Sequence, residues 1–237
     1  MSTIIVRTRQ LEKSYPLYVG SQHERVTVLK GIDWELSEGT LAAIVGVSGC
    51  GKSTFLNIIG LLDCPTSGDL EIDGVSFGSG RTAVESVTHH RSRKIGFIFQ
   101  FHHLLPELSV LQNVMIPLMI QKVSKSTARS KAEACLKGLF SDEEIASGVL
   151  NRTPDRISGG QCQRAAIARA LVCSPSLIIA DEPTGNLDEA TAEEVFTLLL
   201  RVQKERKATI VMVTHNMDQA RRSDVVFRLH NGLLERS

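Results

Sequence analysis

Short apolar runs rich in Val, Ile and Leu recur along this chain and alternate with stretches that have helical periodicity. Runs of this kind, bounded by polar or glycine residues, predict β-strands. Strands are expected at residues 3–9, 26–36, 41–46, 69–73, 95–99, 176–181, 208–214 and 224–229. The alternation predicts an α/β fold with a mostly parallel sheet covered by helices, and the early strands favour an antiparallel side sheet.

The pattern changes between residues 101 and 157, where no strand is expected. Ser109 is placed to cap a helix that runs to about residue 120, and Ser126 to cap another that runs to about residue 139. Ser141, followed by three acidic residues, has the pattern of a third helix start. This stretch is therefore expected to be a helical insert.

Residues 46–53 read Gly-Val-Ser-Gly-Cys-Gly-Lys-Ser, which is the pattern G-x-x-x-x-G-K-S between an apolar run and a helix-forming run. Its glycines allow a close approach to a pyrophosphate, and its amides converge at the start of a helix. Lys52 is expected to reach the β- and γ-phosphates, and Ser53 to bind Mg²⁺. The motif predicts ATP or GTP binding by Gly46, Val47, Ser48, Gly49, Cys50, Gly51, Lys52, Ser53 and Thr54.

A pair of acids, Asp181 and Glu182, ends the apolar run 177–180. Ligands of open α/β sheets bind at the carboxyl ends of strands. Asp181 is expected to hold Mg²⁺, directly or through water, and Glu182 to orient or deprotonate the water that attacks the γ-phosphate. By itself the pair could also cap an ordinary loop, but the phosphate loop at residues 46–53 favours the catalytic interpretation.

Residues 157–161 read Ile-Ser-Gly-Gly-Gln and precede an alanine-rich helical run. Ser158 can cap this helix, and Gly159 and Gly160 leave the first amides open. The positive end of the helix dipole suits a phosphate, and the Ser158 hydroxyl adds a donor. One fold cannot easily bring this second helix end onto a γ-phosphate already held by residues 46–53. We therefore expect it to serve a nucleotide held by a second copy of the chain.

Composition narrows the class of protein further. Lys and Arg number 27 against 26 Asp and Glu, with no long run of one sign, which disfavours nucleic acid as a main partner. The five cysteines lack paired spacing, which favours reduced thiols in a cytosolic compartment. The N-terminus lacks a signal-peptide pattern, and apolar runs fall short of the roughly 18 residues that span a bilayer. If the protein serves a membrane, another chain is expected to cross it.

Two further features have ordinary explanations. The pairs His89–His90 and His102–His103 carry no Cys or carboxylate at ligand spacing, so the sequence does not favour a metal site there. Cys50 occupies a variable position of the phosphate loop; it is expected to be a filler, with redox sensitivity as the alternative.

Three motifs, GVSGCGKS, ISGGQ and LIIADE, match in order and spacing the Walker A, signature and Walker B motifs of one family. With them the chain resembles, over nearly its whole length, the nucleotide-binding subunit of ATP-binding cassette (ABC) transporters. The resemblance implies the cassette form of the P-loop NTPase fold, with ATP and Mg²⁺ bound. It implies one domain over residues 1–237, with a nucleotide-binding core at 1–100 and 158–237 and a helical subdomain at 101–157.

Smaller matches add site residues that the resemblance implies. Tyr15 fits the aromatic that stacks on adenine, Gln100 the glutamine that links the core to the insert, Asp188 the D-loop aspartate and His215 the switch histidine. Singly, each could be an ordinary core, loop or strand-end residue, so the family context carries these assignments. The implied set comprises catalytic Glu182, His215 and Lys52, metal-binding Ser53, Gln100 and Asp181, and, beyond the phosphate loop, nucleotide-binding Tyr15, Gln100, Ser158, Gly159, Gly160, Gln161 and Asp188.

Within the family, residues 96–108 and 180–188 look like the lipoprotein-releasing ATPases, which are close to the macrolide exporters and the cell-division ATPase. This resemblance implies a head-to-tail ATP-bound dimer and transmembrane permease partners. It also implies a place on the cytoplasmic face of the inner membrane. The chain departs from the common pattern at Ile157, where Leu is usual, at Cys162, and in an acidic stretch at 141–151. A cell-division-type recruitment module or a macrolide-export-type ATPase is the alternative. A soluble ABC protein acting on ribosomes or DNA usually has two cassettes or a long coiled coil, and neither is present.

Overall fold

The structure is a computed structural model that describes residues 3–19, 22–78 and 84–237. Its contacts divide the chain into two compact units, Met1–Arg91 with Thr209–Ser237, and Ser92–Ala208. Among the described residues, no helix combines the length and the apolar character that crossing a membrane requires. The division into a core and a helical subdomain at 101–157 stays a prediction.

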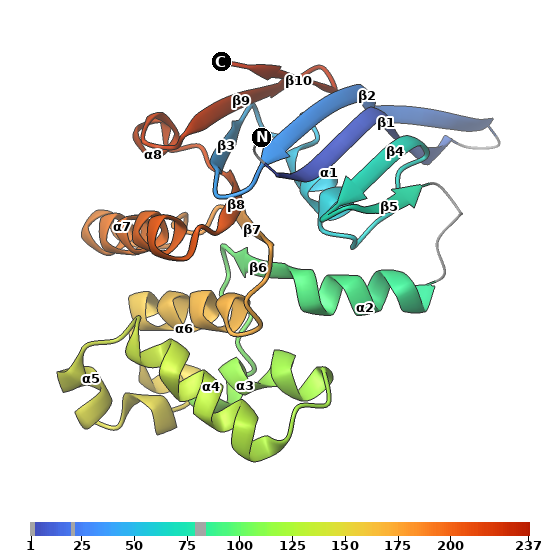
Figure 1. Ribbon diagram of the computed structural model, residues 1–237. Coiled ribbons are helices and arrows are strands. Elements are labelled where there is room, and N and C mark those ends of the chain that lie inside the picture. The colour runs from blue at the N-terminus through green and yellow to red at the C-terminus, as the bar shows by residue number, and fades with distance from the viewer. Residues whose placement is uncertain (1–2, 20–21, 79–83) are drawn as a thin grey trace. The chain divides into compact units, whose positions relative to one another are not determined.

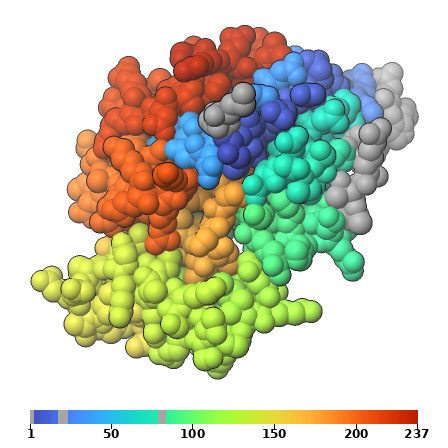
Figure 2. Space-filling view, viewed as in Figure 1, coloured from blue at the N-terminus to red at the C-terminus, as the bar shows by residue number. Residues whose placement is uncertain are grey.

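The first unit contains an antiparallel sheet in the order β2-β1-β4-β5. Strand β1 pairs with β2 along almost its full length, from Ile4 opposite Ser37 to Val19 opposite Gln22. Figure 1 shows this sheet, and Figure 2 shows its strands β1, β2 and β4 side by side at the surface. The expected antiparallel side sheet is confirmed. Its strands are β1 Ile4–Val19, β2 Gln22–Ser37, β4 Ser67–Ile72 and β5 Val75–Gly78.

A second set of strands in this unit follows the order β10-β9-β3-β8. Strand β3 runs parallel to both of its neighbours, β8 and β9. Every residue of β3 and β8 is buried, as expected of parallel strands that read as continuous apolar runs. The strands are β3 Leu41–Val45, β8 Thr209–Val213, β9 Val225–His230 and β10 Leu233–Arg236.

Helix α1, Lys52–Ile59, follows β3 and is held by aromatic packing. The Trp34 ring of β2 meets Phe55 of α1 edge-on at 5.4 Å and Phe227 of β9 edge-on at 5.6 Å. These edge-to-face contacts of the buried rings of Trp34 and Phe55 and the half-buried ring of Phe227 hold the helix against both sets of strands. The first unit also contains α8, Met217–Arg221, and most of α2, Val84–Lys94.

The second unit is built on two parallel strands and a group of helices. Strand β6, Ile95–Phe99, pairs with β7, Leu177–Asp181, in a register that places Phe99 opposite Asp181. Helix α6 approaches β6 so closely that a Cβ added at Gly96 would lie 2.5 Å from the Ala170 carbonyl oxygen. The helical elements are α3 Val110–Ile120, α4 Lys125–Lys137, α5 Asp142–Ala146, α6 Gly159–Leu171 and α7 Glu189–Arg206, with 3₁₀ turns at Val149–Asn151 and Pro154–Arg156.

Most of the predicted helix starts are confirmed. The side chains of Ser109 and Ser141 accept hydrogen bonds from the third helical amide, and each closes a capping box. The prediction that Ser126 caps the next helix is wrong. Ser124 caps it instead, because its Oγ accepts the amide of Thr127, which places Ser126 inside the first turn.

Candidate functional site

The phosphate loop connects β3 to α1, as the sequence predicts. A Cβ at Gly46 would lie 2.4 Å from the carbonyl oxygen of Leu229, so only glycine fits beside strand β9. Gly51 precedes α1 with φ 106°, a left-handed conformation that side chains disfavour. These two constraints bring the loop amides to the helix start without obstruction by side chains.

The side chains of the phosphate loop differ in exposure and in their hydrogen bonds. Lys52 extends back across the loop, and its Nζ donates to the carbonyl oxygens of Gly46 at 2.8 Å and Val47 at 2.9 Å. The ammonium is therefore held over the loop, and its expected contact with the β- and γ-phosphates stays a prediction. Ser53 is exposed at the first turn of α1, whereas Cys50 and Thr54 are half-buried. Val47, Ser48 and Gly49 form the exposed tip.

His215 lies at the same edge of the first unit as the phosphate loop. Strands β3 and β8 are parallel, with Ile44 opposite Val213, and the Thr214 amide donates to the Ile44 carbonyl at 3.3 Å. The carboxyl ends of adjacent parallel strands meet at one edge of a sheet. The histidine that follows β8 is exposed there.

Tyr15 is anchored by its hydroxyl. It donates to Asp63 Oδ2 at 3.0 Å, and Lys13 Nζ donates to Asp63 Oδ1 at 2.7 Å while lying 4.9 Å from the Tyr15 ring centre. Burial raises the pKa of Asp63, but the hydrogen bonds from Lys13, the Cys64 amide and Tyr15 outweigh it and lower that pKa. Tyr15 as a residue is 37% exposed, and aromatic side chains can stack on flat ligands.

The second unit places the acid pair beside Gln100. Asp181 ends β7 and lies opposite Phe99 of β6, so Gln100 and Glu182 follow adjacent parallel strands. A Cβ added at Gly185 would lie 2.9 Å from Gln100 Nε2 and 3.3 Å from Glu182 Oε2. The amide of Gln100 and the carboxylate of Glu182 therefore both lie close to Gly185. Gln100 Nε2 also donates to Asn186 Oδ1 at 2.9 Å.

The backbone at Glu182 is in an uncommon conformation. Its φ is 47°, in the left-handed region, and its carbonyl accepts the Gly185 amide at 3.0 Å. A non-glycine residue held in this region costs on the order of 1–3 kcal/mol, and such residues cluster at functional sites. This turn sets the direction of the Glu182 carboxylate, which lies near Gly185 and which the sequence predicts to be catalytic.

The signature segment, residues 157–161, begins helix α6 as expected. Ser158 is the N-cap: its Oγ accepts the Gln161 amide at 3.2 Å, and its own amide donates to Gln161 Oε1 at 3.1 Å. This capping box leaves the Gly159 and Gly160 amides outside the hydrogen-bond ladder of the helix. A hydroxyl has one donor besides its acceptor sites, so Ser158 keeps a donor for a ligand.

Asp188 has a structural role that sequence reasoning missed. It is the N-cap of α7, where its Oδ1 accepts the Thr191 amide at 3.1 Å. Hydrogen bonds from Thr191 lower the pKa of Asp188. Thr191 in turn lies against the signature segment, because a Cβ added at Gly160 would be 2.5 Å from its Cγ2. The starts of α6 and α7 are therefore neighbours.

The histidine pair at 102 and 103 serves packing and hydrogen bonding. His102 Nδ1 lies 2.6 Å from Oε1 of the buried Gln163, and Arg169 donates to the carbonyls of both histidines. Within the described part of the chain, no group of three or more His, Cys, Asp or Glu side chains could hold a metal ion. All five cysteines are free thiols.

Sequence reasoning also missed Glu144 and Arg164. Glu144 contacts Gln161 of the signature segment, and Arg164 contacts Glu144. Arg164 forms a two-pronged salt bridge with Glu144 at 2.5 and 2.9 Å, and Glu144 also accepts from Gln161. The capping pattern at residues 141–144 was the available signal, since it has Ser followed three residues later by Glu.

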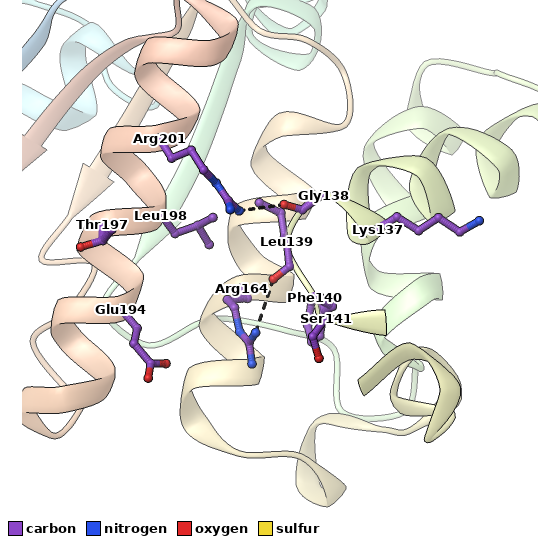
Figure 3. A pocket seen from close by; sticks show the side chains of 10 residues that line it. All are labelled: Lys137, Gly138, Leu139, Phe140, Ser141, Arg164, Glu194, Thr197, Leu198 and Arg201. Carbon is purple, nitrogen blue, oxygen red and sulfur yellow. Dashed lines mark hydrogen bonds between the residues drawn. The ribbon is translucent and has the colours of Figure 1, made fainter. Parts of the chain in front are cut away.

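A pocket of about 410 Å³ lies within the second unit. Figure 3 shows Arg201 donating to the Gly138 carbonyl and Arg164 to the Leu139 carbonyl across it. None of its lining residues belongs to the predicted nucleotide site. Its lining is Lys137, Gly138, Leu139, Phe140, Ser141, Arg164, Glu194, Thr197, Leu198 and Arg201.

Each unit therefore assembles part of the predicted site. The first contains Tyr15, the phosphate loop and His215; the second contains Gln100, the acid pair, the signature segment and Asp188. The joint action of the two sets on one nucleotide stays a prediction.

Comparison with known families matches residues 29–185 to the family described as ABC transporter. The chain belongs to the ABC transporter family, which confirms the resemblance carried by its motifs. A relative from Geobacter metallireducens, the lipoprotein-releasing system ATP-binding protein LolD, is 46% identical over 229 residues, which is 96% of each chain. The protein of the same name from Legionella pneumophila strain Paris is 43% identical over 234 residues, covering 99% of this chain and 98% of that one.

Solved structures agree on the fold. A dimeric post-hydrolysis state of the ATP-binding cassette MJ0796, bound to ADP and Pi, is 38% identical with a TM-score of 0.83. The match covers 98% of this chain and 97% of that chain. This likeness confirms the predicted α/β cassette fold.

Proposed function

We propose that this chain is the ATP-hydrolysing subunit of a membrane ABC transporter that drives a separate transmembrane permease in lipoprotein release. The observation that carries the proposal is the presence, in one chain, of the phosphate-loop motif before α1 and of a second helix start, capped by Ser158, whose first amides are open. The relatives named for lipoprotein release, at 43 and 46% identity over nearly the whole chain, support the particular role.

ATP and Mg²⁺ fit the residues present. The loop offers backbone amides, Lys52 and Ser53 for phosphates, and Tyr15 offers a partly exposed ring for the adenine. Ser53, Asp181 and Gln100 are oxygen donors of the kind that Mg²⁺ prefers, and would hold it. When bound, Mg²⁺ would neutralise charge that develops on the phosphates during transfer.

The chemistry of phosphoryl transfer is mostly positioning. Glu182 orients the attacking water, and Lys52 and His215 donate hydrogen bonds to the γ-phosphate oxygens. The signature segment of a second copy adds the Ser158 hydroxyl and the amides of Gly159 and Gly160. Hydrolysis then requires a head-to-tail dimer in which each copy completes the site of the other. Dimeric structures of the relative MJ0796 support this arrangement.

An apolar groove in the second unit supports contact with a permease. It has a volume of about 470 Å³, and its residues Met119 and Ile120 are 51% and 65% exposed. Exposed apolar patches of this kind mark interaction sites. The groove is lined by Leu108, Gln112, Met115, Ile116, Met119, Ile120 and Lys125. The permease docked here places the chain on the cytoplasmic face of the inner membrane.

The decisive experiment combines Glu182→Gln with reconstitution. The variant is expected to bind ATP, lose turnover and accumulate as a dimer, as measured by phosphate release and light scattering. Wild-type hydrolysis in Glu182→Gln would remove this residue from its role.

The wild-type chain, purified with its permease in lipid vesicles, is expected to release a lipidated protein when ATP is added. ATP-dependent partner recruitment without release would instead identify a cell-division-type module.

A further inference from the structure

The acidic stretch before the signature segment makes a specific connection to it. Glu144, in the first turn of α5, accepts a hydrogen bond from Gln161 Nε2 at 3.0 Å through its Oε1. The same carboxylate accepts two hydrogen bonds from Arg164 and one from the Ser141 amide at 2.9 Å. One carboxylate therefore joins the start of α5 to two residues of α6.

The connection continues to the cap of α6. Gln161 uses its Nε2 toward Glu144 and its Oε1 toward the Ser158 amide. A side-chain amide has its donor and acceptor on opposite sides, so an acceptor at Nε2 determines which atom faces Ser158. Without the Glu144 acceptor, the Gln161 side-chain amide can rotate by about 180°. Its Nε2 donor would then face the Ser158 amide, which is also a donor. Glu144 thus determines the orientation that the capping box needs.

Arg164 holds the carboxylate in place from the other side. Its guanidinium lies 4.8 Å from the centre of the Phe140 ring and donates to the Leu139 carbonyl at 3.4 Å (Figure 3). The side chains of Arg164 and Glu144 are only 25% and 21% exposed. Bidentate arginine–carboxylate pairs of this kind fix the orientation of the carboxylate in addition to pairing its charge.

The carboxylate stays ionised in this setting. Burial raises the pKa of Glu144, but hydrogen bonds from Arg164, Gln161 and the Ser141 amide outweigh burial and lower that pKa. The acceptor that Gln161 requires is therefore present throughout the neutral range.

We propose that Glu144 is a positioning residue for ATP hydrolysis, which acts through Gln161 on the signature serine and glycines. The inference rests on the proposed function, since the signature segment matters only if it completes a nucleotide site. It gives the acidic stretch 141–151 a role, because Glu144 of this stretch holds the start of α6 in the conformation needed to bind the γ-phosphate of the other copy.

The test exchanges the two partners. Glu144→Gln keeps the size of the side chain and a residue suited to the capping box of α5. Gln161→Glu keeps a residue suited to the capping box of α6 but removes the donor toward Glu144. Each single variant is expected to lower kcat roughly tenfold, the loss typical of one hydrogen bond to a charged group. The Kd of the monomer for a fluorescent ATP analogue is expected to stay unchanged.

The double variant Glu144→Gln with Gln161→Glu restores a donor opposite an acceptor and is expected to recover most of the lost kcat. Glu143→Gln is the matched control, because it removes the same charge from the adjacent exposed position of α5. It is expected to leave kcat unchanged.

Losses that simply add in the double variant, or a Glu144→Gln variant with the kcat of Glu143→Gln, would overturn the inference. Since either single variant and the pair test the same link, one unstable variant does not remove the test. A wild-type protein that hydrolyses no ATP would overturn the proposed function instead, so the two failures are distinguishable.

Discussion

Gly96 is the glycine of the second unit at which one added methyl group should lower the free energy of unfolding most. A Cβ there would lie 2.5 Å from the Ala170 oxygen and 3.2 Å from the Ala170 Cβ, whereas ordinary contact begins at 3.4 Å. The obstacle is a backbone carbonyl of α6, which no change of rotamer can move. Gly96→Ala therefore forces α6 away from β6 by roughly 1 Å, because carbon and oxygen cannot overlap.

The size of the effect follows from overpacking, which costs about 1–3 kcal/mol in a well-packed core. For a protein of this size, each kcal/mol lowers the melting temperature by about 2–4 °C. Helix α6 begins at the signature segment and β6 ends next to Gln100, so the displacement is expected to lower the ATPase rate as well.

The assay is urea-induced unfolding of Gly96→Ala beside Gly138→Ala. At Gly138 the added Cβ would have the Cys135 oxygen as its nearest neighbour at 3.5 Å, and the backbone is already helical, with φ −77°. That control is expected to be neutral or slightly stabilising. Equal free energies of unfolding for the two variants would refute the packing argument. Gly96→Ala combined with Ala170→Gly should not recover stability, because the clashing oxygen remains.

Three further outcomes follow from the site and the groove. Ser158→Arg should abolish hydrolysis and leave the ATP affinity of the monomer intact in equilibrium binding; a large loss of that affinity would mean that Ser158 acts in its own subunit. Tyr15→Ala should weaken ATP binding by about 0.5–1.5 kcal/mol in calorimetry beyond the loss of buried area, and Tyr15→Phe much less. Met119→Glu should prevent co-purification with the permease at an unchanged basal ATPase rate; normal co-purification would exclude the groove.

The central strands were predictable because strands buried on both faces consist of consecutive apolar residues. Strands β3, β7 and β8 are buried almost throughout, and each appears as an unbroken apolar run. The strands that sequence analysis missed, β5 and β10, have at most one buried residue each. Such edge hairpins are held by backbone hydrogen bonds, which side-chain patterns do not record.

Helix starts show the same limit at shorter range. Ser124, Ser126 and Thr127 all lie near the start of α4, and all can cap a helix. Only the structure shows that the Ser124 hydroxyl meets the Thr127 amide and also lies 3.2 Å from the Ser126 hydroxyl. Propensity identifies the helix start, whereas the choice between neighbouring hydroxyls depends on local geometry.

The motif residues were found from sequence, but their supporting contacts were not. Glu144 and Arg164 are 20 positions apart, and no spacing rule pairs a residue in one short helix with a residue in another. The capping pattern accounts for one oxygen of Glu144, which accepts the Ser141 amide. The other oxygen accepts from Gln161, and that contact exists only after α5 and α6 have packed.

The predicted chemistry of this chain concentrates at helix starts for one physical reason. The first amides of a helix have no partners within it, so they are the backbone donors that remain available to an anion. The phosphate loop precedes α1, Ser158 caps α6 and Asp188 caps α7. At α6 and α7 the capping side chains of Ser158 and Asp188 also determine how the amides are presented, whereas α1 begins at Gly51 without a side-chain cap. A substitution that disturbs the cap of α6 should therefore lower the rate of hydrolysis, and the exchange of Glu144 with Gln161 tests this.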